Sequence, residues 1–182
     1  MVREISAGGV VVRKKDGEWW MAAIELPGED LPSPELASGE LTADPAPGPG
    51  KRTPRSKAQP VLCLPKGLVD KGEKALDAAL REVREETGIT AVPVTKLADV
   101  KYVYLRTWGD RERVFKIVSF YLLRYESGRI DDISQEMRVE VAKAKWVRLE
   151  DASKLLAYRG EKQMAQKALE YVSSHARFEA ST

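Results

Sequence analysis

The chain has 182 residues, of which 43% are hydrophobic and 32% are charged, and its formal net charge is +2. This length and composition suit one globular domain, and the small net charge favours neither a general nucleic-acid binder nor an acidic, disordered chain. The single cysteine, Cys63, excludes an internal disulfide framework and any multi-cysteine zinc site. The single histidine, His175, excludes zinc sites built on several histidines, and a Ser-His-Asp triad would have to depend on it. No signal peptide and no apolar run approaching ~20 residues is present, so we expect a soluble, cytoplasmic protein without a membrane partner.

The first predicted elements are two strands joined by a turn. Residues 4–13 (EISAGGVVVR) and 19–26 are predicted strands, and the turn KKDGE between them predicts a β-hairpin. The glycine pair Gly8-Gly9 predicts a sheet irregularity or a close backbone approach.

Residues 27–60 change the character of the chain. They hold eight of the ten prolines and segregate acidic residues before basic ones. Such a segment cannot form a packed core, so we expect a long loop inserted into a single domain spanning residues 1–182. It is either a passive surface loop or a lid with a basic end, KRTPRSK.

A short apolar strand, residues 61–64, leads into the stretch GLVDKGEKALDAALREVREETGI at 67–89. Turn-forming residues come first, and good helix formers follow from Lys74 to a glycine at Gly88 that suits a left-handed C-terminal cap. The helical period places one apolar face toward the core, made of Leu76, Ala79, Leu80, Val83 and Thr87.

Downstream, residues 96–107 and 113–125 predict two long strands joined across Trp108-Gly109-Asp110. Residues 144–148 predict a further strand. Asp151 is the predicted N-cap of a final helical region that is interrupted near Gly160. Within that region four residues with helical spacing are predicted to lie in the core: Met164, Ala168, Leu169 and Val172. His175 is predicted to lie at the surface.

Three carboxylates, Glu82, Glu85 and Glu86, share a second face of the predicted central helix through their i+3 and i+4 spacings. Their mutual repulsion weakens an isolated helix by a few tenths of a kcal/mol per close pair. Either a hard cation such as Mg²⁺ sits there or the face is simply solvated and acidic.

The wider spacing decides between these two interpretations. Residues 67–89 match G-x5-E-x7-R-E-U-x-E-E-x-G-U, where U is a bulky aliphatic residue, at every defined position. Average composition puts a chance match on the order of one in a billion per starting position. The chain therefore resembles Nudix hydrolases over most of residues 4–175. The resemblance implies an α/β fold of the Nudix type, an α/β/α sandwich with a mixed sheet and a loop–helix Nudix box, and hydrolysis of a nucleoside diphosphate linked to a further group.

The resemblance also implies a set of catalytic and metal-binding residues. Metal ligands would be Glu82, Glu85 and Glu86, with the Lys66 carbonyl as a backbone ligand; the cofactor would be Mg²⁺, for which Mn²⁺ can substitute. Arg81 would orient a carboxylate, with Glu73 as its partner. Glu140, six residues before Trp146, would add a ligand or base, with Glu136 as the alternative. The glutamate that serves as general base stays open.

The motif LPKG before the box resembles members that act on dinucleoside polyphosphates and diphosphoinositol polyphosphates. Predicted substrate-binding residues are Lys66, Gly67, Tyr102, Tyr104, Lys116 and Tyr121; core or cross-strand packing is the alternative for the tyrosines. The expected partner is a small nucleotide polyphosphate, with diadenosine tetraphosphate favoured and no stable nucleic-acid partner. Diphosphoinositol or 5′-triphosphate RNA pyrophosphohydrolase, sanitising nucleoside triphosphatase and a non-catalytic nucleotide sensor remain open, as does the oligomeric state.

Overall fold

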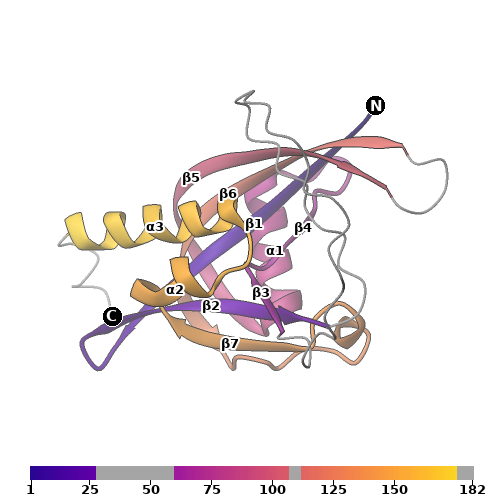
Figure 1. Ribbon diagram of the computed structural model, residues 1–182. Coiled ribbons are helices and arrows are strands. Elements are labelled where there is room, and N and C mark those ends of the chain that lie inside the picture. The colour runs from indigo at the N-terminus through magenta and orange to yellow at the C-terminus, as the bar shows by residue number, and fades with distance from the viewer. Residues whose placement is uncertain (28–59, 107–111, 176–182) are drawn as a thin grey trace, which may run out of the picture.

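The structure is a computed structural model that describes residues 1–27, 60–106 and 112–175. In these ranges a seven-stranded sheet lies between helices (Figure 1). The strands are β1 (Val2–Lys15), β2 (Glu18–Leu26), β3 (Val61–Cys63), β4 (Lys66–Leu68), β5 (Ile89–Leu105), β6 (Arg113–Gly128) and β7 (Lys143–Arg148). The helices are α1 (Ala75–Thr87), α2 (Leu149–Leu155) and α3 (Arg159–Ser174), with a 3₁₀ turn η1 (Met137–Val139).

The sheet is mixed, as expected for the α/β class. Its order is β3-β2-β1-β6-β5; β1 runs parallel to β6, and the other pairs are antiparallel. One edge of β1 serves two partners, since residues 6–8 pair with β4 and residues 12–15 pair with β2. The chain enters α1 soon after β4, so this shared edge places the helix beside the centre of the sheet.

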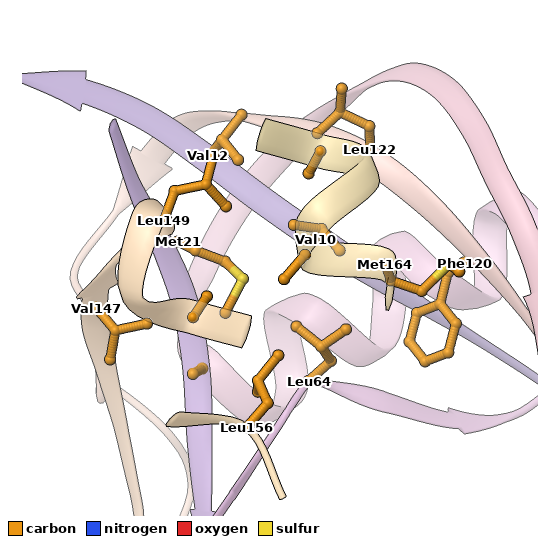
Figure 2. Close-up of a cluster of buried hydrophobic side chains, with 14 of the residues drawn as sticks. Val10, Val12, Met21, Leu64, Phe120, Leu122, Val147, Leu149, Leu156 and Met164 are labelled. Atoms are coloured by element: carbon orange, nitrogen blue, oxygen red, sulfur yellow. The ribbon is translucent and has the colours of Figure 1, made fainter. Parts of the chain in front are cut away.

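Helices cover both faces of the sheet, which explains why β1 is apolar at successive positions instead of alternating. Val10 and Val12 face α2 and α3, where the largest buried cluster also contains Phe120 and Met164 (Figure 2). Val11 points the other way and packs with Val83 of α1. Burial of apolar surface on both faces therefore fixes the register of β1.

The predicted hairpin is confirmed by the antiparallel pairing of β1 and β2. Its turn residues, Asp16 and Gly17, have φ values of 54° and 78°, as a tight hairpin turn requires. Gly8 marks a close backbone approach: a Cβ there would lie 2.6 Å from the Pro65 carbonyl oxygen. Residues 2–12 of β1 pair with β6 without a register shift, so the glycine pair is not a bulge.

The predicted start of the third long strand was wrong. β5 begins at Ile89, directly after α1, and not at residue 96. Pro93 suggested a break, but β5 ends the strand order of the sheet, and its pairing with β6 shifts register beside this proline. An edge strand at a bulge tolerates the missing N–H of proline. The predicted turn at residues 108–110 lies outside the described residues, as does nearly all of the 27–60 insertion.

One detail of the C-terminal region was also wrong. Asp151 is not an N-cap, because α2 begins at Leu149 and Asp151 falls in its first turn. The predicted interruption near Gly160 is present, although Gly160 itself lies in the first turn of α3, where a Cβ would come 2.6 Å from a methyl of Val100. The interruption comes earlier, at residues 156–158. Of the predicted core residues, Met164, Ala168 and Val172 are buried and Leu169 is half-buried, and His175 is exposed.

In the described ranges, no helix is long and apolar enough to cross a membrane.

Candidate active site

Helix α1 supplies the acidic residues of the candidate site. It ends at Gly88, which adopts a left-handed conformation (φ 81°) and donates its amide to the Arg84 carbonyl at 2.9 Å. Its buried face holds Ala78, Ala79, Val83 and Thr87 together with two glutamates, whereas Leu76 and Leu80 are only half-buried. Glu82 is 9% exposed and Glu86 is 6% exposed, while Glu85 is exposed. The helix therefore buries two of its carboxylates beside its apolar stripe.

Strand β4 provides the surface against which the Glu82 carboxylate lies. A Cβ added to Gly67 would overlap the carboxyl carbon and both oxygens of Glu82. The box glycine therefore lets the carboxylate lie directly against the main chain of β4. A side chain at this position would displace the carboxylate.

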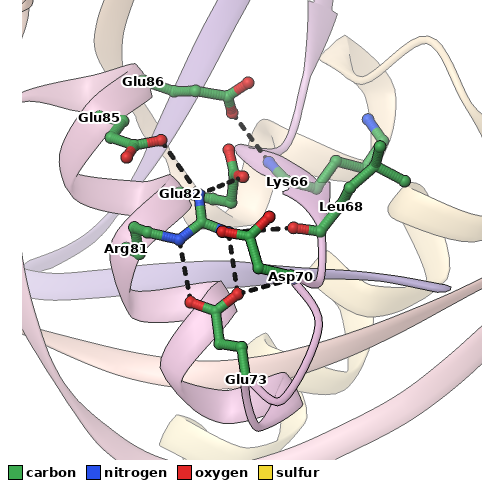
Figure 3. Close-up of polar contacts among 8 residues, drawn as sticks. All are labelled: Lys66, Leu68, Asp70, Glu73, Arg81, Glu82, Glu85 and Glu86. Atoms are coloured by element: carbon green, nitrogen blue, oxygen red, sulfur yellow. Dashed lines mark hydrogen bonds and ion pairs between the residues drawn. The ribbon is translucent and has the colours of Figure 1, made fainter.

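Arg81 gathers the neighbouring carboxylates (Figure 3). Its guanidinium donates to both oxygens of Glu73, at 2.9 and 3.0 Å, and to the carboxylates of Glu82 at 2.8 Å and Glu85 at 3.2 Å. A further bond of 3.0 Å reaches the carbonyl of Leu68. The Arg81 hydrogen bond lowers the pKa of Glu73 to about 2. The predicted pairing of Arg81 with Glu73 is thus present, and it ties the loop before α1 to the helix.

Glu86 has a different partner from the other box glutamates. Its Oε2 accepts the main-chain amide of Lys66 at 2.8 Å. Burial raises its pKa to about 8, and the charges of Glu82 and Glu140 act in the same direction. The Lys66 charge and amide oppose this rise. Burial also raises the pKa of Glu82.

Glu140 lies on the segment between β6 and β7, directly after η1. Glu140 and Glu136 are both exposed, but only the charge of Glu140 is among those that shift the pKa values of Glu82 and Glu86. The position therefore supports Glu140 over Glu136.

The segment that carries Glu140 is tied to the end of α1. The Asp131 amide donates to the Thr87 carbonyl at 2.8 Å, and Asp131 adopts a left-handed conformation (φ 72°). Arg138 donates at 2.8 Å to the Asp131 carboxylate and at 2.8 Å to its carbonyl, and at 3.2 Å to the carbonyl of Ala142. These bonds define the path of the chain just before Glu140.

In the described part of the chain, no three acidic, histidine or cysteine side chains converge closely enough to hold a metal ion. Arg81 engages Glu82 and Glu85, and the Lys66 amide engages Glu86. The donor set nevertheless fits a hard divalent cation, because it consists of carboxylate oxygens of which two are buried with raised pKa values. A cation would offset the burial and mutual repulsion that raise those pKa values.

Lys66 does not present a free ammonium to the box glutamates. Its Nζ lies 2.7 Å from Glu161 of α3, and 5.7 Å from the centre of the Tyr158 ring. Lys66 was predicted to bind substrate, and a phosphate at this position would have to share its ammonium with Glu161.

Tyr104 and Lys116, two predicted substrate-binding residues, lie together around a residue that sequence reasoning missed. The Tyr104 hydroxyl donates to Glu4 at 2.9 Å, Arg106 contacts the same carboxylate at 2.9 Å, and the Lys116 ammonium lies 3.8 Å from it. Tyr102 is on the same face of β5, with its ring centre 6.3 Å from that of Tyr104. This group borders on Lys66, whose charge acts on both Tyr102 and Lys116.

Comparison with known proteins identifies the chain. Residues 50–168 match the NUDIX domain family, which is more than half of the sequence. The chain belongs to the Nudix family.

Three similar proteins illustrate the range of this Nudix chain's relatives. It is 37% identical over 109 residues to the "Putative mutator protein MutT4" of Mycobacterium tuberculosis, covering 60% of this chain and 41% of that protein. It is 33% identical over 116 residues to the asymmetrical bis(5′-nucleosyl)-tetraphosphatase of Mus musculus, covering 60% of this chain and 71% of that protein. A crystal structure of a C. elegans Ap4A hydrolase binary complex superposes with a TM-score of 0.60 at 21% identity, over 94% of this chain and 99% of that chain. The fold is therefore that of Nudix proteins, while the chain spans only about two fifths of the first relative.

The structure places the remaining predicted residue of this Nudix chain, Tyr121, on the opposite face of the sheet. It packs against Ala78 and Ala79 of α1, so its position supports the core alternative and separates it from Tyr102 and Tyr104. Sequence reasoning missed Glu161, although it shares the helical spacing of the buried stripe of α3. Glu4 and Arg106 gave no local signal, since only strand pairing brings them together.

Proposed function

We propose that this Nudix chain is a hydrolase that uses a divalent cation to cleave a phosphoanhydride bond in a nucleoside polyphosphate. One observation carries the proposal: Glu82 and Glu86 are both buried on the Nudix helix, and the charge of Glu140 acts on both. Burying carboxylates together is unfavourable unless a cation or a proton compensates them.

Cleavage of a phosphoanhydride is limited mainly by charge repulsion at phosphorus and by the placement of the attacking water. Mg²⁺ or Mn²⁺ would neutralise phosphate oxygens and lower the pKa of bound water. The ion would be held by the carboxylates of Glu82, Glu85 and Glu86 and by the Lys66 carbonyl, with Glu140 as an additional ligand or base. Arg81 holds the carboxylates of Glu82 and Glu85 in position through charge-assisted hydrogen bonds.

For the substrate we propose a dinucleoside polyphosphate such as diadenosine tetraphosphate, cleaved to ATP and AMP. Two tyrosine rings and the cations of Lys116 and Arg106 lie on one side of the sheet, which suits a ligand that combines bases with several phosphates. The asymmetrical bis(5′-nucleosyl)-tetraphosphatase among the relatives favours the same class.

Product analysis by anion-exchange chromatography tests the proposal. The panel contains diadenosine tetraphosphate, ADP-ribose, nucleoside triphosphates, a diphosphoinositol polyphosphate and a 5′-triphosphate RNA, each incubated with Mg²⁺, with Mn²⁺ and with EDTA. We expect ATP and AMP from the first compound, well ahead of the others, and no products with EDTA. Faster cleavage of another compound would move the substrate to that class.

Glu86→Gln provides the matched control, because its amide oxygen can still accept the Lys66 amide while the charge is removed. We expect turnover to fall by about 10²- to 10⁴-fold, in the range of a lost catalytic group. No cleavage of any compound by the wild-type protein, together with tight binding of one of them, would favour a nucleotide sensor instead.

A further inference from the structure

The buried carboxylate of Glu161 stands out among the groups that the proposed chemistry does not use. Glu161 lies in the first turn of α3 and is only 4% exposed. Its neighbours on the buried face of the helix are Met164, Ala165 and Ala168. A charge in such surroundings is costly unless it is paired and hydrogen-bonded.

Both oxygens of Glu161 contact the connection between β3 and β4. Oε2 accepts the main-chain amide of Leu64 at 2.8 Å, and Oε1 lies 2.7 Å from the ammonium of Lys66. Two contacts from one carboxylate to residues two apart in sequence define both the position and the direction of this short connection.

The same connection holds Glu86 on its other side. The Lys66 amide donates to Glu86 at 2.8 Å, while the Pro65 carbonyl accepts the Gly9 amide of β1 at 3.2 Å. A continuous chain of polar contacts thus runs from α3 through Lys66 to α1, although these helices pack on opposite faces of the sheet.

We propose that Glu161 is a positioning residue for Glu86: by holding the main chain at Leu64 and the ammonium of Lys66, it sets the direction of the amide that orients the Glu86 carboxylate. Only the expected effect of Glu161 on turnover rests on the proposed function. Its structural content, the link from Glu161 to the Lys66 amide, is independent of any substrate.

The alternative is a buried ion pair that only stabilises the fold, and a double substitution separates the two roles. Glu161→Met removes the acceptor of the Leu64 amide and leaves the Lys66 charge buried, so it should destabilise the protein. Adding Lys66→Met removes that stranded charge and keeps the Lys66 amide, and replacing a buried pair by apolar side chains is often neutral or stabilising. The double variant should therefore regain the stability of the wild type, while the Leu64 amide still lacks the hydrogen bond to residue 161.

The first readout is amide hydrogen exchange by NMR, which needs neither metal nor substrate. In the double variant at wild-type stability, we expect the Leu64 and Lys66 amides to exchange at least about tenfold faster, while amides of β6 keep their rates. Glu161→Gln retains an acceptor for the Leu64 amide and should show a smaller change. Unchanged exchange at both amides in the double variant would overturn the proposal, whether or not the protein proves to be a hydrolase.

The second readout is steady-state kinetics on the substrate found by product analysis. We expect kcat of the double variant to stay about 10- to 100-fold below that of the Lys66→Met single variant despite restored stability, the size of loss typical when a supporting partner of a metal-site ligand is removed. Glu161→Gln should recover part of this loss, because it restores the main-chain contact in a protein that still has Lys66. Glu170→Gln, an exposed glutamate on the same helix, should stay within about twofold of wild type. Full recovery of kcat together with stability in the double variant would assign Glu161 a purely structural role.

Discussion

Lys66 contacts Glu86 through its main-chain amide, at 2.8 Å, while its ammonium lies 2.7 Å from Glu161. One residue therefore joins the Nudix helix to the C-terminal helix, and its ammonium is paired with Glu161. The carboxylate of Glu86 is held by a neutral donor, so its burial is only partly compensated within the protein.

The pH dependence of stability follows from that partial compensation. Glu86 keeps its proton in the folded state up to a pKa of about 8, mainly because it is buried, whereas an unfolded chain releases it near the ordinary value of 4.5. Between these values the folded state binds more protons, so the free energy of unfolding should fall as pH rises from about 4.5 to 8 in metal-free protein. Thermal unfolding in EDTA should show a steeper decline for wild type than for Glu86→Gln. Mg²⁺ should stabilise wild type most at the alkaline end, and parallel curves for the two proteins would contradict the assignment.

Gly67→Ala should test whether the position of the Glu82 carboxylate controls kcat independently of the stability of the fold. The new Cβ would overlap the Glu82 carboxylate, so the carboxylate must move. We expect kcat to fall on the order of 100-fold, as for a misplacement of about 1 Å in an active site. Gly17→Ala is the control, because its backbone has a positive φ (78°) but a Cβ there would meet nothing within 4 Å. It should lower the melting temperature and leave kcat unchanged; equal kcat for Gly67→Ala and wild type would refute the role of this contact.

Substitutions around Glu4 should affect substrate binding more than turnover. Tyr104→Phe removes a hydrogen bond of 2.9 Å to Glu4 and should raise KM about 3- to 10-fold, the value of one hydrogen bond. Lys116→Met should raise it further, since it removes a charge that can meet a phosphate. The comparison is Tyr125→Phe, whose hydroxyl donates to the Gly128 carbonyl and whose ring packs with Trp146. If the two phenylalanine variants share one KM, Tyr104 does not bind substrate.

Arg138→Met tests whether the segment after β6 must be ordered for Glu140 to act. The substitution removes three hydrogen bonds, to the Asp131 carboxylate, to the Asp131 carbonyl and to the carbonyl of Ala142. We expect kcat to fall about tenfold or more, with faster amide exchange at residues 131–144. Arg129→Met, an exposed position in the same segment, should change neither quantity. Wild-type kcat in the presence of faster exchange would show that Glu140 does not need an ordered segment to act.

Some of the site could be predicted because its residues are close in sequence. The box lies on one loop and one helix, so helical spacing is enough to place Glu82 and Glu86 near each other, whereas the pairing of Arg81 with Glu73, which precedes the helix, followed from the resemblance to the Nudix box. The hairpin of β1 and β2 was predicted for the same reason, from a turn of a few residues. The helix cap at Gly88 likewise needed only local information.

Other features could not be decided from the sequence because they depend on how distant segments meet. Asp151 is a residue type that often caps helices, yet it lies in the first turn of α2, and Gly160 lies in the first turn of α3 close to Val100. Tyr121 has the same residue type as Tyr102 and Tyr104, but strand pairing sends it to the other face of the sheet.

The sequence by itself determined the Nudix box and the acidic helix, since both depend on spacings within about 25 residues, where helix and turn geometry set the distances. The resemblance carried by that box then implied the α/β class. Only the tertiary structure decided what lies beside that helix. Glu161 is 97 residues from Leu64, Tyr104 is 100 residues from Glu4, and no local rule joins such partners. They meet because apolar faces of strands and helices bury against one another, and this burial fixes the register that brings the polar groups into contact.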